Sequence, residues 1–435
     1  MALLLKNAHV VDPAVELDGC VDVLVEGDKI AAVGENLTCD AAEVIDLAGR
    51  YLVPGLVDMH VHLREPGFEA KGDIESETAA AAHGGFTGVC SMPNTKPVTD
   101  NGVVVEYIKS VAAAKGHCRV YPSGAMTKGL KGEIISEMGD MVEHGCVAFT
   151  DDGHGVQGAG MLRRAMDYGQ MFGKVFMSHC QDEDLVGDGQ INEGAVSTRL
   201  GLLGWPAEGE ELQIMRDIMI AELTGAKLHI QHISTAKGLD MVRAAKAKGL
   251  PVTCEATPHH LFLTEDAIDG TYNTCFKVNP PLRTAADAEA LIAGVIDGRD
   301  ADRRDRPRPA FRLGEVPRVR ARSVRHDRPR DRARLVITNL VKTGKITFAR
   351  MVELMAIEPR KILGLDQVTI AEGSVADLTV FDADVAWTVS EDDFVSHAKN
   401  SGFKGAELTG RARMFSWVES ARSPTASFAK IAVSA

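Results

Sequence analysis

The sequence lacks any apolar run long enough to cross a membrane, and residues 1–6 do not have the pattern of a signal peptide. It has no Cys-x-x-Cys pair, and its eight scattered cysteines favour reduced, mostly buried thiols over a disulfide framework. Positive charge is scarce, because 48 Lys and Arg face 61 Asp and Glu, a net charge of −13. We therefore expect a cytoplasmic globular protein that binds neither nucleic acid nor membrane.

The most informative local pattern is an apolar stretch that ends in two histidines. Residues 51–59 are mainly apolar, and His60 and His62 follow, one residue apart. Side chains at i and i+2 of a strand share a face, so both imidazoles can bind one metal ion. Arg64 continues that face as a fixed cation for an anionic group. The alternative is a pair of ordinary histidines at the end of a strand.

Beyond residue 54 the pattern alternates between strands and helices. We predict strands at 56–60, 88–92, 119–124, 146–150, 174–179, 227–232 and 251–256. Helices are predicted between them, such as 74–83, 103–114, 160–171, 210–223 and 238–248. This alternation implies parallel strands, and seven units with room for an eighth predict an α/β fold of the (β/α)8 TIM-barrel type.

Both ends of the chain have short, alternating strand patterns instead. We expect them to pair into one small β-sandwich. The predicted division is 1–54 plus 366–435 for the sandwich and 55–365 for the barrel.

Polar residues stand where the predicted strands end. The potential metal ligands among them are His60, His62, Asp151, Asp152, His179 and His232. Chemistry in such barrels is found at the carboxyl ends of the strands, so we expect these side chains to meet. Taken singly, each has an ordinary explanation, since a lone histidine is more often a core residue and Asp-Asp-Gly is more often a turn. His259 and His260 also follow a strand, but we do not expect them to be ligands.

Several motifs resemble those of dihydroorotases, in the cyclic amidohydrolase superfamily. They are HVHLREPG (60–67), MPNTKP (92–97), TDDG (150–153), SHCQD (178–182), HIQHIST (229–235), NPPLR (279–283), EPRKILGL (358–365) and GSVADLTVFD (373–382). They cover nearly the whole chain outside 299–334 and the last twenty or so residues. Hydantoinases and allantoinases resemble the chain more loosely, and a cyclic amidohydrolase of that type is the alternative.

The resemblance implies one or two zinc ions in a centre bridged by an aspartate, as in the class I type. The implied metal ligands are His60, His62, Asp152, His179 and His232, with Asp151 as the alternative bridge. The implied substrate ligands are Arg64, Asn94 and Asn279. The implied reaction is the reversible hydrolysis of dihydroorotate to N-carbamoyl-aspartate in pyrimidine synthesis. The expected assembly is a homo-oligomer, with aspartate transcarbamoylase as a further candidate partner.

Residues 299–334 do not resemble the family. They contain 14 Arg, six acidic residues and no Lys. Family members carry Thr-Asp-His-Ala-Pro-His on the eighth strand, and its Asp is the catalytic base. That Asp should fall at position 306, where this chain has Arg306. Asp305 is the nearest carboxylate, but a neighbour on a strand points to the opposite face.

We interpret this segment as the product of a shifted reading frame. Read one nucleotide later, codons for residues 305–310 can encode Thr-Asp-His-Ala-Pro-His, and those for 316–335 can encode FPEFELAPFGMTGLETALAL, which resembles the family. The original frame returns at 336, and the tail after about 413 is a weaker second case. The other interpretations are a solvated basic loop and a patch for an acidic partner.

The shifted frame has consequences for the chain as written. The catalytic Asp is absent, and 14 arginines are not expected to be buried in a barrel wall, so we predict an impaired enzyme. An inactive dihydroorotase-like subunit that supports aspartate transcarbamoylase is the non-catalytic alternative.

Overall fold

The computed structural model describes residues 2–297, 329–392, 394–397 and 400–416, and the structural statements below concern these residues. The predicted eighth strand, Asp305 and Arg306 lie outside them, as does the tail from 417.

A curved parallel sheet positions the site. Its described strands are ordered β14-β13-β10-β9-β8-β7-β6. Their bounds are β6 (Leu56–Val61), β7 (Phe86–Ser91), β8 (Arg119–Gly124), β9 (Ala148–Phe149), β10 (Val175–Ser178), β13 (Leu228–Ile230) and β14 (Val252–Cys254). All six residues of β6 are buried, as expected for a parallel strand that is covered on both faces. The predicted parallel strands are confirmed, although β9, β13 and β14 are shorter than expected.

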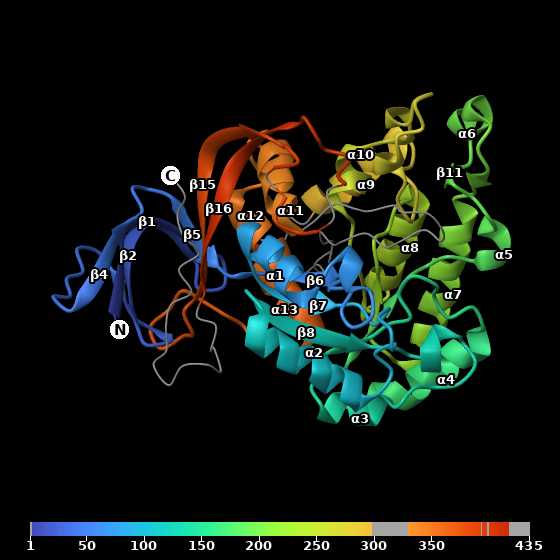
Figure 1. Cartoon of the computed structure of the whole chain (residues 1–435), viewed down its shortest axis with the longest axis horizontal. Helices are drawn as coiled ribbons and strands as arrows, with labels where there is room; N and C mark the ends of the chain where they lie inside the picture. Colours follow the sequence, from blue (N-terminus) through green and yellow to red (C-terminus); the bar gives the residue numbers. More distant parts are fainter. Residues whose placement is uncertain (1, 298–328, 393, 398–399, 417–435) are drawn as a thin grey trace.

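Helices alternate with these strands and cover the sheet (Figure 1). They are α1 (Ile74–His83), α2 (Gly102–Lys115), α3 (Met138–Glu143), α4 (Ala159–Gly169), α7 (Glu208–Thr224), α8 (Ala236–Ala247), α9 (Pro258–Phe262) and α10 (Ala285–Ile296). Helix α1 begins where predicted because Asp73 accepts a hydrogen bond from the Ser76 backbone N–H at 2.7 Å, which caps the helix. The alternation confirms the expected α/β barrel class.

An insertion between β10 and β13 lies at the end of the molecule away from the sheet that the two chain ends form, called the terminal sheet below (Figure 1). It contains α5 (Glu183–Val186), β11 (Ile191–Asn192), α6 (Ala195–Leu200) and β12 (Gly204–Trp205), and β11 pairs with β12 in parallel.

The two chain ends meet in one sheet, ordered β16-β15-β5-β1-β2-β3, with β4 paired to β1. The bounds are β1 (Ala2–Asp12), β2 (Leu17–Glu26), β3 (Lys29–Gly34), β4 (Ala42–Asp46), β5 (Tyr51–Pro54), β15 (Asp377–Thr388) and β16 (Glu407–Ser416). Strand β15 pairs antiparallel with β5, so the predicted pairing of the ends is confirmed. The proposed domain limits at 54 and 366 stay a prediction.

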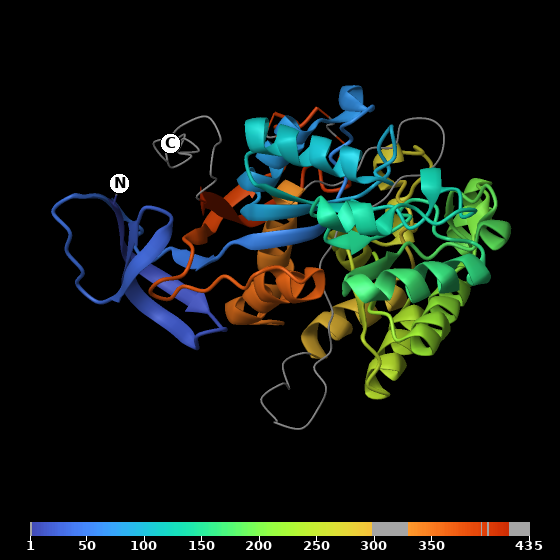
Figure 2. The same ribbon diagram turned by 90° about the horizontal axis from the view of Figure 1, so that it is seen from below.

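A helical run connects the two sheets. It comprises α11 (Pro329–Val336), η7 (Ile337–Val341), α12 (Phe348–Val352), η8 (Glu353–Ile357) and α13 (Glu358–Leu363). Helix α12 packs against β1 and α13 packs against β6. Figure 2 shows this run, in orange, beside the blue terminal sheet.

Two arginines of the anomalous segment are buried in this region. Arg332 is 1 % exposed and forms an ion pair with Asp58, and Arg334 is 3 % exposed. The guanidinium of Arg334 lies 4.8 Å from the Trp387 ring centroid and donates to the carbonyl of His83. A carboxylate, an aromatic face and a carbonyl receive these two arginines of α11. The expectation that 14 arginines are not buried in a barrel wall concerns the predicted eighth strand, which lies outside the described residues, and it stays a prediction.

The cysteines agree with a reduced protein. All eight are free, and five of them are buried. No helix among the described residues is long and apolar enough to cross a membrane.

Candidate metal centre

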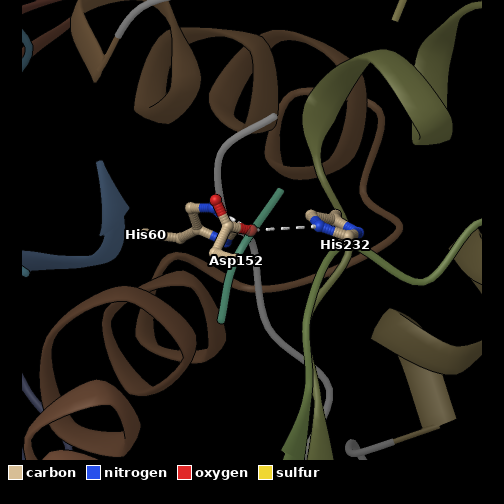
Figure 3. A group of neighbouring side chains, drawn as sticks. All are labelled: His60, Asp152 and His232. Carbon is tan, nitrogen blue, oxygen red and sulfur yellow. Dashed lines mark ion pairs between the residues drawn. The ribbon is translucent and has the colours of Figure 1, made fainter. Parts of the chain in front are cut away.

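The carboxylate of Asp152 lies among four histidines. Its Oδ1 is 3.4 Å from Nε2 of His60, 3.6 Å from Nδ1 of His179 and 3.7 Å from Nε2 of His232. Its Oδ2 is 3.5 Å from Nε2 of His62. Each of these side chains is at most 2 % exposed. Figure 3 shows Asp152 between His60 and His232.

These five residues come from the carboxyl ends of four parallel strands, as the barrel predicts. His60 lies on β6 and His62 follows that strand. His179 directly follows β10, whereas His232 and Asp152 follow β13 and β9 within three residues. His232 has a positive φ of 34°, a conformation that is strained for a residue with a Cβ. The surrounding contacts therefore hold this residue in a conformation that it would not adopt alone.

The structure brings Asp152, and not Asp151, to the histidines. Asp151 instead accepts hydrogen bonds from the backbone N–H groups of Met126 at 2.7 Å and Thr127 at 3.1 Å, and from the Thr127 hydroxyl. Burial raises the pKa of Asp151 to about 6 despite these bonds. Asp151 thus fixes the loop after β8.

Burial and neighbouring charges shift the pKa values of the residues in this cluster in different directions. Burial opposes a charge on His60, but Asp152 and Glu255 raise its pKa to about 10. Burial, with His179 and His60 nearby, lowers the pKa of His232 to about 3. Burial opposes ionisation of Asp152 as well, yet His60 and the other nearby rings hold its pKa well below the usual range. The centre therefore contains an ionised carboxylate beside the neutral imidazole of His232, which are the forms that bind metals. A metal ion would have to displace a proton from His60, whose pKa is raised.

The donor atoms fit a divalent metal ion. His60, Asp152 and His232 each offer a ligand atom, and these atoms lie within 4.8 Å of one another. His60 Nε2 and Asp152 Oδ1 are buried without a hydrogen-bond partner among the described residues. Buried polar atoms of this kind need an explanation, and a cation bound between them supplies one. Imidazole with carboxylate is a donor set typical of zinc and related ions.

The three predicted substrate ligands surround this centre. The Oδ1 of Asn94 is 3.0 Å from Nδ1 of His62, and its Nδ2 is 3.3 Å from Asp152 Oδ2. Arg64 has a positive φ of 71°, and its charge adds to burial in holding the pKa of His62 well below its usual value.

Asn279 reaches the centre through a glutamine. Its Nδ2 donates to Oε1 of Gln181 at 2.9 Å, and that oxygen lies 3.0 Å from Nε2 of His179. His260 lies 3.0 Å from the carbonyl of Pro280 and 2.9 Å from the hydroxyl of Thr257, and none of the ion pairs to Asp152 among the described residues involves it.

Sequence reasoning missed several residues that contact the histidines, among them Glu255 and Gln181. Glu255 directly follows β14 and lies 2.8 Å from Nδ1 of His60. The available indication was a glutamate at the carboxyl end of a predicted apolar strand, 251–256. Gln181 stands two residues after His179, within the SHCQD motif.

Comparison with known proteins gives a consistent result. Residues 49–238 match the family described as dihydro-orotase-like. The chain is 45% identical over 421 residues to a dihydroorotase of Pelotomaculum thermopropionicum, covering 94% of this chain and 96% of that protein. It is 44% identical over 417 residues to a dihydroorotase of Geobacter metallireducens, with 95% and 97% covered.

Solved structures with a similar fold include hydantoinases. A D-hydantoinase from Thermus sp. has a TM-score of 0.78 at 25% identity, covering 94% of this chain and 93% of that one. An L-hydantoinase from Arthrobacter aurescens has a TM-score of 0.77 at 23% identity, with the same shares covered, and shows the fold alone.

Proposed function

Because this chain belongs to the dihydroorotase family, we propose that Asp152 and its four histidines hold the zinc on which the family reaction depends. The reaction is the reversible hydrolysis of the cyclic amide of dihydroorotate to N-carbamoyl-aspartate. The observation that carries the proposal is the carboxylate of Asp152 within 3.7 Å of four buried imidazoles. Bound divalent ions would supply Lewis-acid activation of the ring carbonyl and of a water molecule.

We assign the remaining roles to residues at the edge of the centre. Arg64 would bind the substrate carboxylate, because a guanidinium matches a carboxylate in charge and geometry. Asn94 would orient the substrate and also hold His62, whose Nδ1 is 3.0 Å away. Asn279 would contact the ring, and its bond to Gln181 at 2.9 Å supports a fixed orientation.

The proton transfers of the reaction need an acid–base group that this chain does not supply at the expected position. Position 306 is an arginine, and its sequence neighbour Asp305 would point to the opposite face if this segment were a strand, as the resemblance implies. We propose that the chain as written holds its metal but turns substrate over poorly.

Two alternatives follow from the same residues. Hydantoin has no carboxylate, so a hydantoinase-type activity would not need a cation such as Arg64 near the substrate. The presence of Arg64 therefore favours dihydroorotate over hydantoin as the substrate. A non-catalytic subunit of aspartate transcarbamoylase is favoured by Arg306, but the intact histidine cluster argues against it. Homo-oligomer formation is proposed from the resemblance alone.

Calorimetric titration of the zinc-loaded protein tests the substrate assignment without requiring turnover. Dihydroorotate should bind, and Arg64→Gln should weaken it roughly 10- to 100-fold, because a charged hydrogen bond contributes about 1.5–3 kcal/mol. The control is Arg163→Gln, which removes an exposed arginine that pairs with Asp167 on α4. Hydantoin binding as tight as that of dihydroorotate, with no effect of Arg64→Gln, would contradict the assignment.

A further inference from the structure

A second carboxylate lies behind His60, on the side of the ring away from Asp152. Glu255 is fully buried, and its Oε1 is 2.8 Å from Nδ1 of His60. Its Oε2 lies 3.5 Å from Nε2 of His229. His229 is fixed in turn, because its Nδ1 is 2.7 Å from the hydroxyl of Thr253. The carboxylate is therefore held between two imidazoles rather than free to rotate.

This contact decides which nitrogen of His60 carries a proton. A carboxylate only accepts hydrogen bonds, so Nδ1 of His60 is the donor and bears the hydrogen. The Gln231 amide nitrogen is 3.2 Å from the same Nδ1, but an amide nitrogen is itself a donor and cannot accept that hydrogen. A metal ion that displaces the second ring proton then meets the lone pair on Nε2, the nitrogen 3.4 Å from Asp152 Oδ1.

Among the described contacts of the site, the neighbouring rings have neutral partners instead. Nδ1 of His62 faces the amide oxygen of Asn94 at 3.0 Å. Nε2 of His179 faces the amide oxygen of Gln181 at 3.0 Å. A negative partner on the remote nitrogen makes an imidazole a stronger electron donor to a metal than a neutral partner does. His60 is therefore expected to be the strongest imidazole ligand of these three.

We propose that Glu255 is a positioning residue of the metal centre, which fixes the tautomer of His60 and strengthens its bond to the metal. The proposal rests on the metal centre proposed above and extends it to β14, a strand that supplies no ligand itself. It also explains the burial of His229, which supports the carboxylate from the other side.

Cobalt titration of the purified full chain tests the proposal without using activity. Glu255→Gln keeps the shape of the side chain and removes its charge. It should weaken Co²⁺ binding, measured against a competing chelator, about 10- to 100-fold, and it should shift the visible absorption of the bound cobalt. The matched control is Glu77→Gln on α1, a carboxylate that is 7 % exposed and receives the Ser396 hydroxyl. The control should bind Co²⁺ like the parent chain.

The outcomes separate the two proposals. A parent chain that binds no Co²⁺ contradicts the metal centre itself. A parent chain that binds Co²⁺ while a folded Glu255→Gln binds it equally well, with the same spectrum, refutes the role of Glu255 alone. Should Glu255→Gln fail to fold, ¹⁵N spectra of the zinc-loaded parent decide the matter. Nδ1 of His60, assigned with His60→Asn, must carry the proton, and an unprotonated Nδ1 overturns the proposal.

Discussion

Asp377 connects the terminal sheet to the barrel, and replacing it should lower the unfolding free energy of the protein. Asp377 begins β15, and its side chain is 1 % exposed. Its Oδ2 accepts from Nη2 of Arg360 at 2.8 Å and from Nη1 of Arg119 at 2.7 Å. Because Arg360 lies on α13 and Arg119 on β8, one carboxylate joins β15 to a helix 17 residues away and to a barrel strand 258 residues away in the sequence. Asp377→Ala leaves both guanidinium groups without this partner.

The magnitude follows from the burial of each arginine. Removing one partner of a buried ion pair costs about 3–5 kcal/mol. Arg360 is 3 % exposed, but in the variant it still donates hydrogen bonds to the carbonyls of Gly55 at 2.6 Å and Ala356 at 3.0 Å. The loss of its ion pair should therefore cost about 3 kcal/mol, the lower end of that range. Arg119 is 30 % exposed and adds at most about 1 kcal/mol. We expect a total loss of about 4 kcal/mol of unfolding free energy.

Equilibrium urea unfolding, followed by circular dichroism, measures this loss. The control is Asp382→Ala on the same strand, since Asp382 pairs with Arg50 at 3.0 Å where the two side chains are 19% and 33% exposed. That pair should contribute less than about 1 kcal/mol. Equal and small losses for both variants would refute the reasoning that the buried pair couples the sheet to the barrel.

Three predictions concern the metal centre and its surroundings. The Asp152→Asn variant should lose bound zinc, whereas Asp151→Asn should retain it, because Asp151 holds the loop at Met126 instead of contacting the histidines. Elemental analysis after gel filtration measures the zinc content, and equal zinc loss in the two variants would contradict this assignment. Chelation should lower the melting temperature by several degrees and zinc should restore it, because binding to the folded state alone stabilises it; a melting curve insensitive to both argues against the site. Asn279→Ala should weaken dihydroorotate binding in calorimetry while zinc content stays constant, and loss of zinc would assign it to the metal instead.

The parts of the fold that the sequence predicted are those encoded locally. Helix α1 begins and ends as expected because the Asp73 cap and the apolar spacing that follows it lie within a dozen residues. The pair His60 and His62 reaches one carboxylate because alternation along a strand fixes their shared face. The strand-end positions of His179 and His232 followed from the same logic of parallel strands.

The parts that escaped prediction depend on contacts between distant segments. Nothing near His60 in the sequence indicates that Glu255, 195 residues away, contacts its far nitrogen. From the sequence, the resemblance alone favours Asp152 over Asp151, because alternation along a strand of two residues cannot specify how the loop after β9 turns. Arg332 can be buried because it pairs with Asp58 on β6, and these two residues lie near opposite ends of the barrel sequence.

The most direct test of the account compares two chains. One is the chain as written, and in the other the codons for residues 299–335 are returned to the alternative frame. Both are purified, loaded with zinc and assayed for zinc content and for dihydroorotate hydrolysis. We expect zinc in both chains and at least about 100-fold faster hydrolysis by the restored chain, which is the low end of what a positioned acid–base group contributes. Equal turnover by the two chains would contradict it, because the residue at position 306 would then not matter.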